Sequence, residues 1–344
     1  MKVQNLNRLV KFLRRIIPKL LPLGYVLSLI FVLTSCDVFS FLNYQSSSPI
    51  PQTQDLSLLE PYAIQLQNSL MNRFVSGGYV ISRRNNQPVE LGDSLLWTSL
   101  ALAALPCEEA TQLFNAVYRS AYYRSGALVR FEPLPAEYQR DPASRDSEVG
   151  AMLGISVYAS RCQNPVAKSL WQLHSRFVAQ NGWHVNSVGD PTKTLMSPAL
   201  EYVFSRVSDQ LGGQWLDITG GPEVFESGLI ANVESVRASH SACYPVHLST
   251  LQILLLATLN KPITPFSRGL FCSATEGMDL PLTDWYCERT NGRAYLSSFV
   301  LNQYEYRHQR CGSWEGPDGG GLESPGLDWL IMYKFAGGQI RQVN

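Results

Sequence analysis

The chain has 344 residues, of which 45% are hydrophobic, 11% aromatic and 16% charged. This composition excludes a disordered or low-complexity protein, and the length fits one large domain or two ordinary ones. The formal net charge is zero, but six of the 28 basic residues fall within residues 1–35, which contain no acidic residue. The rest of the chain is therefore net acidic. Since a protein that binds nucleic acid is expected to carry a basic excess, nucleic acid is not a predicted partner.

Residues 1–35 have the parts of a secretory signal, namely a basic start, an apolar run and a boundary of small residues. The apolar run is shorter than the about 20 residues that a comfortable membrane-spanning helix needs. The boundary sequence LTSC at residues 33–36 resembles the lipobox of bacterial lipoproteins. The resemblance implies cleavage before Cys36 and acylation of that residue, with the lipid bilayer as a partner. The alternative is an uncleaved membrane anchor, and both interpretations predict a body outside the cytoplasm, in the periplasm or on the cell surface.

Residues 36–55 are rich in Ser, Pro and Gln and have no sustained hydrophobic period, which predicts a lipid-anchored linker. Residues 56–344 are expected to form a single helical domain. Hydrophobic spacing predicts helices over residues 56–74, 93–105, 108–124, 146–161, 164–180, 197–210, 225–238, 246–259, 294–306 and 326–336. Long loops are expected over residues 125–145, 182–196, 261–293 and 311–326, and two short strands or a loop over residues 77–92. Long loops within a compact domain are often functional.

The predicted helices contain a repeated pair. Asp93-Ser94 begins an almost wholly apolar helix that ends near Cys107, and an amphipathic helix follows. About 53 residues later, Asp146-Ser147 begins a second apolar helix that ends near Cys162, and another amphipathic helix follows. Such a repeat predicts stacked helical hairpins, each with one buried and one outer helix. The fold class is therefore expected to be all-α.

The segments GDSLLWTSLALAAL (92–105) and SRDSEVGAMLGISVYA (144–159) resemble, in pattern, the inner helices of (α/α) toroid proteins. This architecture occurs in many glycoside hydrolases, polysaccharide lyases and sugar epimerases. The resemblance implies inner helices that run parallel, with a substrate cleft formed by the loops at one end. The predicted helices leave open whether the toroid is complete or incomplete.

Six cysteines besides Cys36 form an even set, which favours disulfides in an oxidising compartment. Cys107 and Cys162 follow the C-termini of two helices expected to be parallel neighbours, so they are predicted to form a bridge. The other expected pairs are Cys272–Cys287, which are close in sequence, and Cys243–Cys311, which remain. A zinc site made by Cys243, Cys311 and their neighbouring histidines is the alternative to the last pair. No resident metal ion and no cofactor are predicted.

Asp93 and Asp146 are the candidate catalytic residues. If their helices run parallel, the two carboxylates lie near the same end of the domain, and glycoside hydrolysis requires two carboxylates facing one cleft. The alternative is that both are ordinary helix N-caps, since Asp is preferred at that position.

Aromatic and polar residues on the predicted loops are candidates for substrate binding. These are Arg145, Trp183, His184, Trp314 and Asp318. Trp and His suit stacking against sugars and hydrogen bonding to them, although each is also a common packed or surface residue. The functional face is expected at the N-terminal ends of the inner helices. The sequence thus predicts an envelope lipoprotein that binds or hydrolyses a polysaccharide, or alternatively a non-catalytic envelope scaffold or binding protein.

Overall fold

The computed structural model describes residues 56–84, 87–89, 91–186, 194–215, 221–239, 244–278, 280–290, 322–323 and 326–340. All of them belong to the compact unit Ser47–Asn344. The predicted signal peptide and the linker, including Cys36, lie outside the described residues. No helix in the described part is long and apolar enough to cross a membrane.

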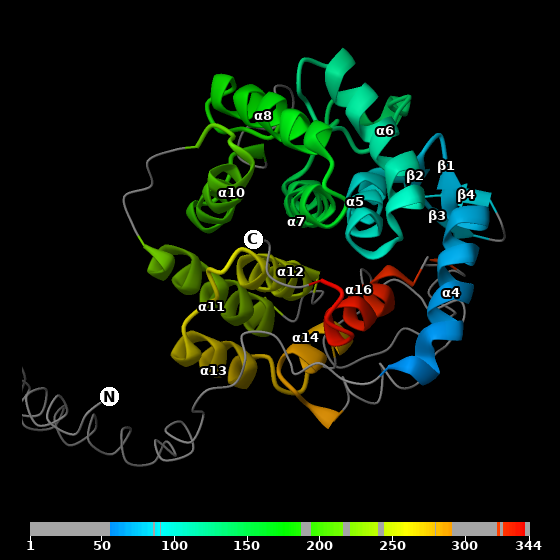
Figure 1. Ribbon diagram of the computed structural model, residues 1–344. Helices are drawn as coiled ribbons and strands as arrows, with labels where there is room; N and C mark the ends of the chain where they lie inside the picture. The colour runs from blue at the N-terminus through cyan, green and yellow to red at the C-terminus, as the bar shows by residue number, and fades with distance from the viewer. Residues whose placement is uncertain are drawn as a thin grey trace, which may run out of the picture. The chain divides into compact units, whose positions relative to one another are not determined.

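The described part contains eleven α-helices and five short strands, which confirms the all-α fold class (Figure 1). The helices are α4 (Glu60–Ser69), α5 (Ser94–Ala104), α6 (Cys107–Tyr123), α7 (Arg145–Arg161), α8 (Pro165–Gln180), α10 (Pro198–Leu211), α11 (Pro222–Ser239), α12 (Tyr244–Thr258), α13 (Pro265–Ala274), α14 (Pro281–Tyr286) and α16 (Leu327–Ala336). The strands are β1 (Val75–Ser76), β2 (Tyr79–Val80), β3 (Ser82–Arg84), β4 (Gln87–Val89) and β5 (Leu322–Glu323).

The prediction of a loop over residues 261–293 was wrong in part, because this segment contains α13 and α14. Both helices begin with a proline, which disrupts a helix interior but fits the first helical turn, where its missing N–H is not needed. Thr264 caps α13, its hydroxyl accepting from the backbone N–H of Ser267 at 3.2 Å. The predicted helix over residues 294–306 lies outside the described residues.

The two predicted buried helices, α5 and α7, are buried as expected. All eleven residues of α5 are buried, and α7 is buried over Ser147–Ala159. A Cβ atom on Gly154 would lie 2.0 Å from the Ser99 carbonyl oxygen, so only glycine allows this close approach of the two helices.

The contacts between α5 and α7 also fix their direction. Gly150 faces Leu96 and, one turn further along, Gly154 faces Ser99. The two helices therefore run parallel, as the repeat predicts. Figure 1 shows them side by side, with α6 and α8 on their outer side.

The outer helices α6 and α8 complete two hairpins. In α6 the buried residues recur every three or four positions (Ala110, Leu113, Phe114, Ala116, Val117, Ser120 and Ala121), as expected for a helix with one covered face. Only Leu105 and Pro106 separate α5 from α6, so α6 returns toward the end at which α5 begins. The expected helical hairpins are thus present.

Three later helices begin at a common end of the body. His247 near the start of α12 lies 3.3 Å from Asp328 at the start of α16, measured between Nε2 and Oδ1. Thr250 of α12 hydrogen bonds Thr283 of α14 at 2.8 Å. Strand β5, which precedes α16, pairs antiparallel with β3, which precedes α5. The starts of α5, α12, α14 and α16 therefore lie toward the same end.

Helix α5 contacts both α7 and α16, α7 contacts α12, and α14 contacts both α12 and α16. These contacts are those expected between neighbouring inner helices. A toroid built from them stays a prediction.

Two of the expected disulfides are confirmed. Cys107–Cys162 and Cys272–Cys287 are bonded, with Cα–Cα distances of 5.6 and 5.5 Å. The first joins α6 to the residue that follows α7, at the end where α5 and α7 finish. Cys243 and Cys311 lie outside the described residues.

Candidate functional site

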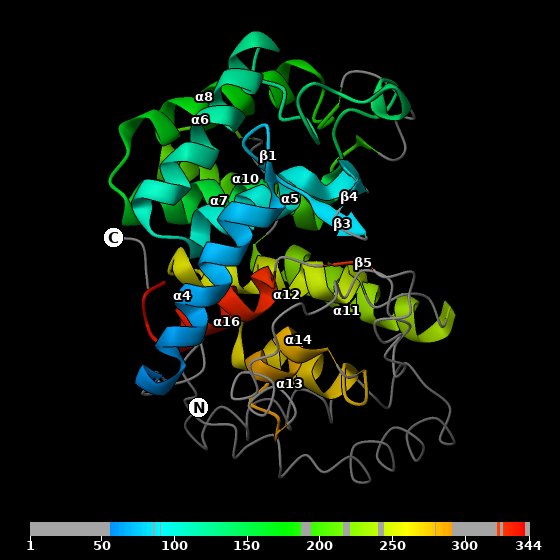
Figure 2. The same cartoon turned by 90° about the vertical axis from the view of Figure 1, so that its right-hand side faces the viewer.

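We define the long-loop end as the end of the body at which α5 and α7 begin. The connection from α4 to α5 carries strands β1–β4, and residues 124–144 lead from α6 into α7. In Figure 2 the strands β3, β4 and β5 lie together on the right-hand side of the molecule. This is the end at which the sequence places the functional face.

Asp93 lies at the long-loop end but is covered by Arg130 from the loop before α7. The Arg130 guanidinium is 3.8 Å from Asp93 Oδ1, and it donates to the Gly92 carbonyl at 2.8 Å and to the Asp141 carboxylate at 2.7 Å. The Tyr138 ring lies 5.5 Å from the same guanidinium. Because Asp93 is only 2% exposed, its carboxylate does not present an open face to a substrate in this structure.

Asp146 lies at the same end in a different setting. The helix begins one residue earlier than predicted, and its N-cap is Ser144, whose hydroxyl accepts from the Ser147 N–H at 3.2 Å. Asp146 is half-buried in the first turn, where a carboxylate is stabilised by the helix dipole. Neither aspartate thus acts as a side-chain cap, since Asp93 at the start of α5 makes no capping hydrogen bond. The adjacent Arg145 is exposed.

Trp183 and His184 follow α8, which returns antiparallel to α7, and so they also lie toward the long-loop end. The Trp183 ring meets Phe204 edge-on, with 6.0 Å between the ring centroids. The His184 imidazole is 2.9 Å from the hydroxyl of Thr194, measured from Nδ1. Both side chains are half-buried and thus leave only part of their surface to a ligand. The other two candidates, Trp314 and Asp318, lie outside the described residues.

A buried ion pair at this end was not predicted. His174 of α8 lies 2.9 Å from the Glu148 carboxylate through Nε2 and 2.9 Å from the Gly126 carbonyl through Nδ1. A carbonyl and a carboxylate both accept hydrogen bonds, so this arrangement favours an imidazole with protons on both ring nitrogens and a positive charge. Burial lowers the pKa of His174, but the charge and hydrogen bond of Glu148, with the Gly126 carbonyl, raise it above its ordinary value.

His247 and Asp328 form a second buried pair, between α12 and α16. Burial raises the pKa of Asp328, and the nearby His247 opposes that shift. Among the described residues, no group of three or more His, Cys, Asp or Glu side chains is arranged to hold a metal ion. The zinc alternative involving Cys243 and Cys311 lies outside the described residues.

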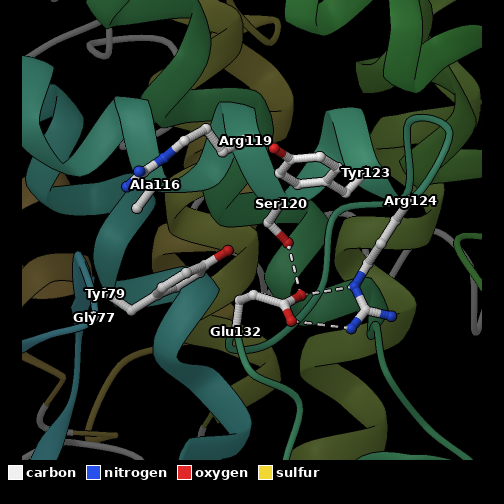
Figure 3. Close-up of a pocket in the computed structure, with 8 residues that line it drawn as sticks. All are labelled: Gly77, Tyr79, Ala116, Arg119, Ser120, Tyr123, Arg124 and Glu132. Carbon is white, nitrogen blue, oxygen red and sulfur yellow. Dashed lines mark hydrogen bonds and ion pairs between the residues drawn. The ribbon is translucent and has the colours of Figure 1, made fainter.

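A pocket of about 560 Å³ opens between the β1–β2 turn, the C-terminal half of α6 and Glu132 (Figure 3). Its lining residues are Gly77, Tyr79, Ala116, Arg119, Ser120, Tyr123, Arg124 and Glu132. Gly77 and Gly78 both have positive φ, as a tight two-residue hairpin turn requires. A Cβ atom on Gly78 would lie 2.4 Å from that of Ala116, so the turn sits directly against α6.

Hydrogen bonds join the polar side chains of the pocket. The Glu132 carboxylate accepts from Ser120 at 3.2 Å and from Arg124 at 2.7 Å. Burial raises the pKa of Tyr79 to about 12, and the nearby Ser120 hydroxyl opposes that shift. Glu132 belongs to the loop singled out from the sequence, but its partners, Ser120 of α6 and Arg124 directly after α6, were missed. An Arg or Ser in or beside an amphipathic helix resembles an ordinary surface residue.

The chain matches no protein-family model, no curated protein and no solved structure. The resemblance to lipoproteins and to toroid carbohydrate-active proteins therefore stays a prediction from the sequence.

Proposed function

We propose that this protein is a lipid-anchored component of the bacterial cell envelope that binds a polysaccharide at the long-loop end of its helical body. The observation that carries the proposal is the parallel packing of α5 and α7, seen in the facing pairs Gly150–Leu96 and Gly154–Ser99. Parallel helices bring their N-termini, with Asp93 and Asp146, to one end of the body. Helix N-termini offer unpaired N–H groups and a positive dipole end, which suit polar or anionic ligands.

Within this proposal the two aspartates have different roles. Asp146, half-buried in the first turn of α7, is the carboxylate that accepts hydrogen bonds from sugar hydroxyls. Asp93 holds Arg130, and through it the loop before α7, in place. The burial of Asp93 favours binding without hydrolysis, because hydrolysis requires two carboxylates that both reach the glycosidic bond.

The binding proposal is tested with the full-length protein in detergent on an array of envelope and extracellular polysaccharides. Binding should be retained by Asp209→Asn, an exposed control on α10, and reduced by Asp146→Asn. Release of reducing ends from a bound polysaccharide, lost in both Asp93→Asn and Asp146→Asn, would instead support hydrolysis by the paired carboxylates. The absence of binding to any polysaccharide would favour the non-catalytic scaffold.

The lipid anchor is tested separately. Cys36→Ser should release the protein from membranes or stop its processing, and mass spectrometry of the wild type should find an acylated Cys36 as the first residue. An unmodified Cys36 with residues 1–35 still attached would contradict the anchor and leave the polysaccharide proposal to be judged on binding alone.

A further inference from the structure

The pocket beside α6 has a cationic side chain with no acidic partner among the described residues. Arg119 is exposed, and its Nε donates at 3.2 Å only to the Asn115 carbonyl of its own helix. Arg124, in contrast, is paired with Glu132. The two arginines and one carboxylate leave the pocket with one positive charge in excess, located on Arg119. An anionic group of a ligand would supply the partner that Arg119 lacks.

The rim of the same pocket carries an exposed aromatic side chain. Tyr123 is 83% exposed, and the neighbouring Tyr122 is 65% exposed with its ring centroid 6.0 Å away. In Figure 3 Arg119 and Tyr123 project from α6 on the opposite side of the pocket from Tyr79 and Glu132. A broad apolar face beside polar groups is suited to the apolar face of a sugar ring.

The inner wall of the pocket offers groups that match sugar hydroxyls. The Glu132 carboxylate accepts hydrogen bonds, and the hydroxyl groups of Tyr79 and Ser120 lie beside it. A carboxylate at this position disfavours a phosphate dianion, which would place two more negative charges near it. The wall therefore favours a ligand that combines several hydroxyl donors with a single negative charge.

We propose that this pocket binds a carboxylate-bearing sugar unit, such as a uronate, of the polysaccharide. Arg119 binds the sugar carboxylate, Tyr123 packs against the ring, and Glu132 accepts from ring hydroxyls. The volume of about 560 Å³ lies within the range usual for small-molecule sites. The inference rests on the proposed function, since the C-terminal half of α6, which lines the pocket, lies toward the long-loop end. It narrows the proposed ligand from any polysaccharide to an acidic one.

The test is isothermal titration calorimetry on the full-length protein in detergent, with a galacturonic acid trimer and its methyl ester as matched probes. The acid should bind, and the ester, which lacks the negative charges, should bind about tenfold more weakly. Arg119→Gln should weaken binding of the acid by about tenfold and abolish the difference between the probes. Tyr123→Ala should weaken both. The matched control is Arg237→Gln, an exposed arginine on α11, which should bind the acid like the wild type.

The inference is overturned if the wild type binds neither probe, if acid and ester bind equally well, or if Arg119→Gln binds the acid like the wild type. The proposed function fails by a different result, namely the absence of binding to every polysaccharide on the array. If a neutral polysaccharide binds and Asp146→Asn weakens it while Arg119→Gln does not, the polysaccharide site stands at the long-loop end and only the acidic-sugar pocket is wrong.

Discussion

The two ends of the helical hairpins are held together by different chemistry. Where α5 and α7 finish, the chain turns within two or three residues, the Cys107–Cys162 disulfide joins the hairpins, and Arg161 donates to the Leu102 and Leu105 carbonyls. Where they begin, long loops enter the body. The Arg130–Asp93 ion pair ties the loop before α7 to the start of α5, and His174, which pairs with Glu148 of α7, also binds the Gly126 carbonyl in that loop.

Under the proposed function, this difference separates the end that stabilises the fold from the end that binds the ligand. A covalent bridge and short turns fix the spacing of the hairpins at one end. At the other end, the exposed Arg145, the half-buried Asp146 and the loop before α7 remain near the surface, where a ligand can reach them. The comparison predicts that disruption of the disulfide end changes stability, whereas substitution of the half-exposed groups at the long-loop end changes binding.

The largest effect on stability is expected from the disulfide between the hairpins. Cys107 and Cys162 are 55 residues apart, and closing a loop of that length stabilises the fold by about 4 kcal/mol in the chain-entropy model. Cys272 and Cys287 are 15 residues apart, for which the same model gives about 3 kcal/mol. In urea unfolding, the Cys107→Ala/Cys162→Ala variant should have a lower free energy of unfolding than the Cys272→Ala/Cys287→Ala variant. The reverse order would show that loop closure is not what the first bridge contributes.

A somewhat smaller loss is expected from Glu148→Gln. The substitution leaves His174 buried beside a neutral amide, and breaking a buried ion pair costs about 3 kcal/mol. Urea unfolding should show this loss, while Glu137→Gln, an exposed control in the loop before α7, should unfold like the wild type. Equal stability of Glu148→Gln and wild type would mean that the pair does not hold the long-loop end.

The same pair predicts the pH dependence of stability. The folded-state pKa of His174 is raised above its ordinary value of 6.5, so protonation favours the folded state. This contribution is fully present below pH 6.5 and is lost as the pH rises through the raised pKa. As the pH rises above 6.5 and through the raised pKa, the wild type should therefore lose more stability than Glu148→Gln. Parallel pH profiles of the two proteins would contradict a charged His174.

The smallest effect on stability is expected at the start of α7. Ser144 provides the N-cap hydrogen bond, so Ser144→Ala should cost about 1 kcal/mol. Asp146→Ala removes a favourable charge from the first turn and leaves the Ser144 cap in place, so it should cost less. The stabilities of the two variants are compared by thermal unfolding. A greater loss of stability in Asp146→Ala than in Ser144→Ala would indicate that Asp146 has a mainly structural role.

The elements that the sequence predicts well are those whose signal is local. The Asp-Ser starts, the small apolar residues of α5 and α7, and the cysteines that follow them are visible within one segment, and their repeat indicates parallel packing. Helices α13 and α14 were missed because each is short and begins with a proline. A short segment with a proline resembles a loop in the sequence, and only the structure shows that Thr264 caps α13.

The candidate site is only partly predictable, because its contacts join distant segments. Asp93 and Arg130 are 37 positions apart, and His174 lies 26 positions from Glu148. Nothing local marks Arg130 as the residue that covers Asp93, or His174 as charged. The pocket beside α6 likewise depends on the β1–β2 turn meeting Ala116, which only the packed structure reveals.

The central claim, that the long-loop end binds the ligand while the disulfide end holds the fold, is tested most directly by hydrogen–deuterium exchange. The full-length protein in detergent would be compared with and without the tightest-binding oligosaccharide from the polysaccharide array. Bound ligand should add protection in residues 124–148 and none in residues 102–109 or 159–166. Protection confined to the disulfide end, or spread equally over both ends, would contradict it.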